Sequence, residues 1–85
     1  MINKNYKTNK EIRIEAKKLN LKEVNCGKFP KGQLVFKHPD KKFYYSYDID
    51  GHNGGVWKGA KRIDDLFSKH TRCGTYDENL NRIGD

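Results

Sequence analysis

Apolar and polar residues alternate most clearly between Phe43 and Ile49, and this alternation predicts a β-strand. In an extended chain, neighbouring side chains point to opposite faces. One face then carries Phe43, Tyr45, Tyr47 and Ile49. The opposite face carries Tyr44, Ser46, Asp48, Asp50 and, as the strand gives way to a loop, His52. We therefore expect one packed face and one polar face, with two carboxylates and an imidazole beside a glycine-rich loop.

A helix is predicted to begin at Thr8, because the segment Thr8-Asn9-Lys10-Glu11 fits a capping box. The apolar stripe of this helix consists of Ile12, Ala16 and Leu19. The charged residues away from the stripe are Arg13, Lys17 and Lys18. We expect the helix to end near Asn20, with one side on a sheet and a basic side toward solvent or phosphate.

The rest of the chain has the pattern of short strands separated by turns. Strand runs are expected at Gln33 to Lys37, Phe43 to Ile49, Val56 to Ala60, Arg72 to Asp77 and Leu80 to Ile83, with a helical turn or short helix at Arg62 to Ser68. Strands without regular helical crossovers favour an antiparallel sheet. We predict a single α+β domain over residues 1–85, in which an N-terminal helix packs on a small, twisted antiparallel β-sheet. Its basic helical part covers residues 1–28, and the sheet with the active site covers residues 29–85.

Charge is distributed unevenly along the chain, whose formal net charge is +7. Residues 1–42 hold twelve Lys/Arg and four Asp/Glu (12 − 4 = +8), whereas residues 43–85 hold six and seven (6 − 7 = −1). A basic half can neutralise phosphates and bind nucleic acid in a salt-dependent manner. Lysines also serve as a solubilising surface, but no long apolar run is present that would anchor the domain in a membrane. Nucleic acid is therefore the favoured partner.

The two cysteines, Cys26 and Cys73, lack the local spacing of a zinc site. They are interpreted as packing residues or as a single optional disulfide. The chain as given contains no signal peptide or transmembrane stretch, and we expect it to be delivered as part of a larger secreted or cell-surface protein.

Two segments, YDIDGHNGG and CGTYDENLNRIGD, resemble the cytotoxic ribonuclease domain of the ribosome-cleaving colicins. The resemblance covers roughly residues 43–85, with an insertion around Lys61 to His70, and extends to the C-terminal toxin domains of CdiA-type contact-dependent growth-inhibition proteins. It implies metal-independent cleavage of 16S ribosomal RNA at the decoding centre in the target-cell cytoplasm, without a cofactor. It also implies a cognate immunity protein, which we expect to be acidic and to bind a monomeric toxin domain in a 1:1 complex.

By this resemblance, His52 matches the family histidine, and Asp48 or Asp50 matches its aspartate. The family also has a later motif, a glycine, a small residue, an aromatic residue and an aspartate before a turn. The segment Gly74-Thr75-Tyr76-Asp77 matches this motif. The family glutamate that follows the histidine has no counterpart, because Gly54, Gly55 and Val56 occupy that neighbourhood. Either the second aspartate of the Asp48/Asp50 pair substitutes for it, or Lys58 supplies a different kind of assistance.

Ribonuclease chemistry explains why these residue types matter. RNA supplies its own nucleophile, the 2′-hydroxyl, so the protein needs a base, an acid and a cation for the charged phosphorane. His52 with Asp48 and Asp50 can move the protons. Lys58 is the first candidate for the cation and Arg72 the second. The alternative interpretations are turn-forming aspartates, a solvated Lys58, and an Arg72 paired with an acidic neighbour.

Further residues are expected to contact RNA or to serve the fold. The expected RNA contacts are Lys41, Lys42, Tyr44, Lys61 and Arg62, with Tyr44 exposed and available for stacking on a base. Trp57 is expected in the core. His38 and His70 are expected to be structural or simply exposed.

Three other functions stay open at this point. The first is cleavage of transfer RNA by the same chemistry. The second is a metal-dependent nuclease in which Asp48, Asp50 and His52 are the ligands. The third is an RNA-binding module without enzymatic activity.

Overall fold

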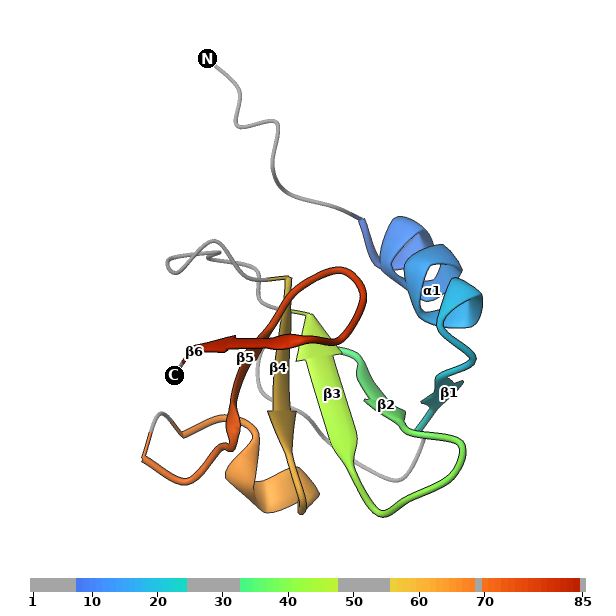
Figure 1. Ribbon diagram of the computed structural model, residues 1–85. Coiled ribbons are helices and arrows are strands. Elements are labelled where there is room, and N and C mark those ends of the chain that lie inside the picture. Colours follow the sequence, from blue (N-terminus) through green and yellow to red (C-terminus); the bar gives the residue numbers. More distant parts are fainter. Residues whose placement is uncertain (1–7, 25–32, 48–55, 69, 85) are drawn as a thin grey trace.

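A computed structural model describes residues 8–24, 33–47, 56–68 and 70–84, and in them a helix lies beside a six-stranded sheet (Figure 1). The elements are α1 (Asn9–Lys18), β1 (Lys22–Glu23), β2 (Val35–Lys37), β3 (Tyr44–Tyr47), β4 (Trp57–Ala60), the 3₁₀ turn η2 (Ile63–Asp65), β5 (Gly74–Tyr76) and β6 (Arg82–Gly84). Each strand pairs antiparallel with the next in the chain. The predicted α+β fold is therefore confirmed.

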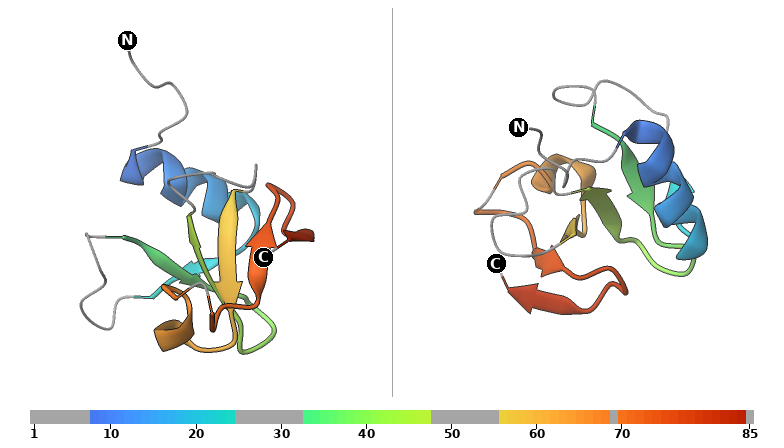
Figure 2. Two further views of the ribbon diagram at one scale, coloured as in Figure 1. Left: turned by 90° about the vertical axis from the view of Figure 1, so that its left-hand side faces the viewer. Right: turned by 90° about the horizontal axis from the view of Figure 1, so that it is seen from above.

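Thr8 caps helix α1, as the sequence predicts. The Glu11 amide donates a hydrogen bond to Thr8 Oγ1 at 3.2 Å, and the Thr8 amide donates to Glu11 Oε1 at 2.9 Å. Ile12 and Ala16 are buried in the core, so the predicted apolar stripe is confirmed for these two residues. The helix ends shortly before Asn20, whose φ of 63° lies in the left-handed region. Figures 1 and 2 show α1 beside β1 and β2, at one end of the sheet.

Aromatic side chains fill the core on the face of the sheet that α1 covers. Trp57 is 1% exposed and packs edge to face against Phe36 and Tyr47, with ring centroids 5.8 and 5.5 Å apart. Tyr45 and Tyr76 pack in the same way at 5.6 Å. The predicted packing face of β3 is therefore confirmed, and Trp57 is a core residue as expected.

The opposite face of β3 is also packed, which differs from the predicted polar face. Ser46 is fully buried, and its hydroxyl donates a hydrogen bond to Gln33 Oε1 at 3.0 Å. Tyr44 is half-buried against a second core, made of Val35, Ala60 and Leu66. The expectation of an exposed Tyr44 on an open polar face is wrong, because the segment after β4 folds back and covers this face.

Asp77, the last residue of the predicted strand run Arg72 to Asp77, lies outside β5 and forms the turn that leads to β6. Its Oδ1 atom accepts hydrogen bonds from the backbone amides of Asn81 and Asn79, at 2.9 and 2.8 Å. These donors, Asn81 first, lower the pKa of the Asp77 carboxyl below its ordinary value. The turn extends through Leu80, whose φ is 67°, so β6 begins at Arg82 and not at Leu80 as predicted.

Strand β1 was missed by the sequence analysis. It pairs with β2 and places sheet structure inside the segment 1–28 that was expected to be only helical. The Arg13 guanidinium of α1 donates to Glu23 of β1 at 2.9 Å, which joins the helix to the sheet. This ion pair also occupies part of the helix surface that we expected to face phosphate. A strand of only 2 residues shows no alternation that a sequence pattern could reveal.

Candidate functional site

Asp48, Asp50 and His52, the residues of the predicted acid-base site, lie outside the described residues. The sheet is described on both sides of them. Tyr47, the last residue of β3, pairs directly with Trp57, the first residue of β4, and both belong to the aromatic core or pack against it. The predicted site segment is therefore bounded by a paired and packed end of the sheet, and the assignment of its residues stays a prediction.

Lys58 lies at the centre of a row of side chains that crosses three strands. The register pairs it with Ser46 of β3 on one side and with Thr75 of β5 on the other. Paired residues point to the same face, with Cβ atoms roughly 4.5–5.5 Å apart. The Lys58 ammonium also lies 5.6 Å from the centroid of the Phe67 ring. The alternative interpretation, that Lys58 is a solvated charge at the edge of the sheet, is wrong. Strand β4 is an inner strand, and the Lys58 side chain is half-buried.

Thr75, next to Lys58 in this row, is a polar residue that the sequence analysis named only as part of the segment Gly74-Thr75-Tyr76-Asp77 and gave no role of its own. Its side chain is fully buried, and its Oγ1 atom has no hydrogen-bond partner among the described residues. A buried hydroxyl without a partner costs stability, since it has lost its hydrogen bonds with water. A functional role is one of the reasons for which a folded protein keeps such a group.

Replacing Thr75 with valine is expected to raise the free energy of unfolding by about 1 kcal/mol, because valine has a similar shape and no hydroxyl to desolvate. Urea unfolding followed by the fluorescence of Trp57 measures the change. The matched control is Thr75→Ser, which keeps the hydroxyl and loses a buried methyl group, and we expect it to lower stability by about 1 kcal/mol. Loss of stability in Thr75→Val would show that the hydroxyl has a partner after all.

Arg72, the second candidate cation, lies away from Lys58 along the sheet. The last pair of the β4–β5 ladder is Gly59 with Gly74, and the amide of Cys73 donates to the Gly59 carbonyl at 2.8 Å. This register places the half-buried Arg72 beyond the ladder, toward Ala60. The two candidate cations are therefore not brought together at one point of the sheet.

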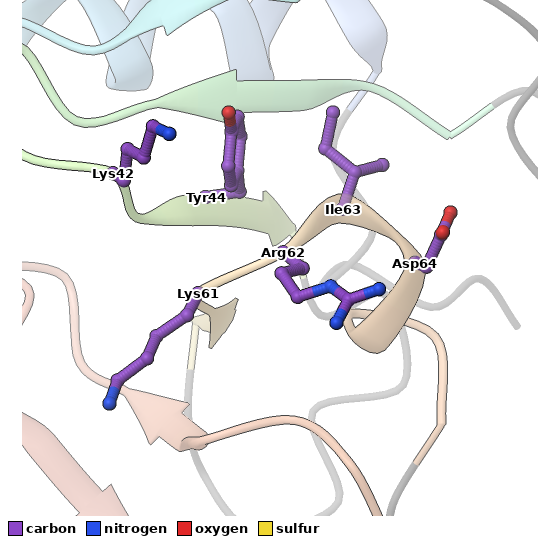
Figure 3. A pocket seen from close by; sticks show the side chains of 6 residues that line it. All are labelled: Lys42, Tyr44, Lys61, Arg62, Ile63 and Asp64. Atoms are coloured by element: carbon purple, nitrogen blue, oxygen red, sulfur yellow. The ribbon is translucent and has the colours of Figure 1, made fainter.

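A basic hollow lies at the other end of β3 and β4 from the predicted acid-base segment. Antiparallel pairing of Tyr44 with Ala60 brings the residues before β3 next to the residues after β4. The hollow has a volume of about 350 Å³ and is lined by Lys42, Tyr44, Lys61, Arg62, Ile63 and Asp64. We call it the Tyr44 hollow. Figure 3 shows Lys42, Tyr44 and Ile63 projecting in the same direction, whereas Lys61 and Arg62 extend away from them.

The Tyr44 hollow gathers most of the residues predicted to contact RNA. Its three cations and one carboxylate give a formal net charge of +2. Lys41 does not line it; this residue is exposed in the turn before β3, where its carbonyl accepts a hydrogen bond from Lys37 Nζ at 3.3 Å. Ile63 and Asp64 were missed, because they belong to a short 3₁₀ turn whose position beside β3 depends on the sheet register. Cations beside a tyrosine ring can bind a phosphate together with a nucleobase.

The other histidines and the cysteines that the sequence analysis considered were not predicted to act in catalysis. His38 Nδ1 accepts a hydrogen bond from the Asp40 amide at 3.0 Å, so His38 helps to form the turn between β2 and β3. His70 is exposed, and Cys73 carries a free thiol. Cys26 lies outside the described residues. Within the described ranges, no group of His, Cys, Asp and Glu side chains could hold a metal ion, and no helix is long and apolar enough to cross a membrane.

Comparison with known proteins gives one family match. Residues 14–85, most of the chain, match the model of the family described as Novel toxin 21 (Ntox21). No curated protein and no solved structure gives a significant match. The matched range includes every strand of the sheet, the Tyr44 hollow and the segment that carries His52.

Proposed function

Because the chain belongs to the Novel toxin 21 family, we propose that this toxin domain is a ribonuclease that cleaves 16S ribosomal RNA at the decoding centre. The observation that carries the proposal is the Tyr44 hollow, which is lined by a tyrosine ring and by the three cations Lys42, Lys61 and Arg62. A basic surface with an aromatic ring is suited to single-stranded RNA, whose bases are free to stack. The resemblance of residues 43–85 to the ribosome-cleaving colicins supplies the choice of ribosomal RNA.

In the proposed mechanism, the 2′-hydroxyl of the RNA attacks the adjacent phosphorus, and the bond to the 5′-oxygen breaks. His52, with Asp48 and Asp50, removes the proton from the 2′-hydroxyl and returns a proton to the leaving 5′-oxygen. The products are a 2′,3′-cyclic phosphate and a free 5′-hydroxyl. This chemistry needs no metal ion.

Lys58 is proposed to stabilise the charge that develops on the phosphorane. Its half-buried position favours this role, because a cation in a partly desolvated site interacts more strongly with an anion than one in water. The Phe67 ring and the strand pairing with Ser46 and Thr75 restrict where the ammonium can lie. Arg72 is proposed to act on a more distant part of the substrate, because it lies beyond the β4–β5 ladder.

Incubation of the purified domain with intact ribosomes and EDTA tests this function. We expect one cut in the RNA of the small subunit, with a 2′,3′-cyclic phosphate at the new end. If ribosomal RNA stays intact while transfer RNA is degraded, transfer RNA would replace ribosomal RNA as the proposed substrate. Cleavage only after addition of a divalent metal would favour the metal-dependent nuclease, and binding of RNA without any cleavage would favour the non-enzymatic module.

The proposed partner, besides the small ribosomal subunit, is an acidic immunity protein that binds the monomeric domain 1:1. The formal net charge of +7 supports an acidic partner, because opposite charges accelerate association. A toxin domain of this family is consistent with delivery to target cells. We propose that a larger secreted or cell-surface protein carries it, and that it acts in the cytoplasm of the target cell. An immunity protein with a neutral or basic contact surface would contradict the charge argument.

A further inference from the structure

Asp64 is the one acidic residue among the described residues that line the Tyr44 hollow. It is exposed in η2, and its carboxylate makes no ion pair or hydrogen bond with any described residue. Lys61 and Arg62 lie three and two positions before it in the chain. Figure 3 shows Lys61 extending away from Asp64, whereas Arg62 extends toward its side of the hollow without forming an ion pair with it. A carboxylate that stays unpaired in a basic hollow is available to a ligand that carries hydrogen-bond donors.

The lining residues are arranged in an order that suits a nucleotide. Figure 3 shows Lys42 at one end of the hollow, Tyr44 and Ile63 in the middle, and Asp64 at the other end. A cation binds a phosphate, an aromatic ring and an apolar side chain contact the two faces or the edge of a base, and a carboxylate accepts hydrogen bonds from the base. The volume of about 350 Å³ falls in the range of small-ligand sites.

The chemistry of a carboxylate selects among the four bases. Two carboxylate oxygens accept side by side, and guanine presents two adjacent donors, N1–H and the N2 amino group, on its Watson–Crick edge. Adenine and cytosine place an acceptor beside their amino group, and uracil flanks its N3–H with two carbonyl oxygens. We infer that the Tyr44 hollow is a subsite for a guanine nucleotide, with Asp64 accepting from the base, Tyr44 stacking on it and Lys42 binding its phosphate.

This subsite would lie on the same face of the sheet as Lys58. Tyr44 and Ala60 form one pair of the β3–β4 ladder, and Ser46 and Lys58 form the next pair on that face. The two pairs are about 7 Å apart along the strands, a distance that a nucleotide adjoining the reacting phosphate can span. For its place in catalysis, the inference rests on the proposed ribonuclease function. Together, the subsite and this function predict that a guanosine lies near the cleaved bond of the RNA.

Titration of the isotope-labelled full chain with GMP, AMP, CMP and UMP tests the inference without any need for cleavage. We expect GMP to bind about tenfold or more tightly than the other three, because a bidentate contact discriminates bases by that order. Shifts of the amide resonances of Tyr44, Ile63 and Asp64 in NMR spectra would locate the nucleotide in the hollow. Asp64→Asn is expected to abolish the preference for GMP, since an amide offers only one acceptor oxygen.

Asp40→Asn is the matched control, because Asp40 is an exposed carboxylate in the nearby turn that does not line the hollow. It makes the same change of charge and is expected to keep the preference for GMP. Equal binding of the four nucleotides, or a preference that survives in Asp64→Asn, would overturn the inference. RNA cleavage by a domain that binds all four equally would leave the proposed function intact. Selective binding of GMP by a domain that cuts no RNA would instead refute only the proposed function.

Discussion

Replacing Trp57 with alanine is expected to lower the free energy of unfolding by about 3–5 kcal/mol, the usual cost of deleting a buried large aromatic side chain. Trp57 is 1% exposed and packs against the rings of Phe36 and Tyr47. A domain of 85 residues has a small core, so this loss removes much of its total stability. The midpoint of thermal unfolding should fall by roughly 15 °C or more.

Circular dichroism is the suitable measurement for this variant, because Trp57 is the single tryptophan of the chain and its replacement removes the fluorescence signal. Ile83→Ala is the matched control. Ile83 is 47% exposed on the edge strand β6, and its truncation should change stability by less than about 0.5 kcal/mol. Comparable losses in the two variants would contradict the assignment of the core to the aromatic cluster around Trp57.

The elements that the sequence predicted well are those with a strong local signal. The capping box at Thr8 marks the start of α1, and the aromatic alternation of Tyr45 and Tyr47 marks the packed face of β3. Asp77 is typical of a turn, because an aspartate side chain readily accepts hydrogen bonds from the backbone amides that follow it. In each case the residues that form the sequence signal lie within a few positions of one another in the chain.

The features that the sequence did not reveal depend on contacts between distant segments. The sequence pattern placed Ser46 on a polar face, yet its side chain is fully buried. Leu66 belongs to the second core on this face of the sheet, and Phe67 packs against that core. Asp64 becomes part of a basic hollow only because Tyr44 pairs with Ala60. No local pattern contains the strand register that produces these neighbours. Residue types at the candidate site could therefore be read from the sequence, whereas their grouping needed the fold.

Replacing His52 with alanine is expected to lower the rate of RNA cleavage by about 10²- to 10⁴-fold, the usual contribution of a positioned acid or base. RNA binding should change little, because the cations of the Tyr44 hollow remain in place and supply the phosphate contacts. Single-turnover cleavage of ribosomal RNA at a saturating concentration of the domain separates the two effects. Nitrocellulose filter binding gives the affinity independently.

His70→Ala makes the same substitution at an exposed histidine and is the matched control for this prediction. It should cleave at the rate of the wild type, and thermal unfolding of both variants should match that of the wild type. A His52→Ala domain that is folded and still cuts RNA at full rate would remove the imidazole from the mechanism. Loss of cleavage in His52→Ala, together with a requirement for added metal in the wild type, would instead assign His52 to a metal site. The proposal therefore requires a slow His52→Ala variant, an unaffected His70→Ala variant and a wild type that stays active in EDTA.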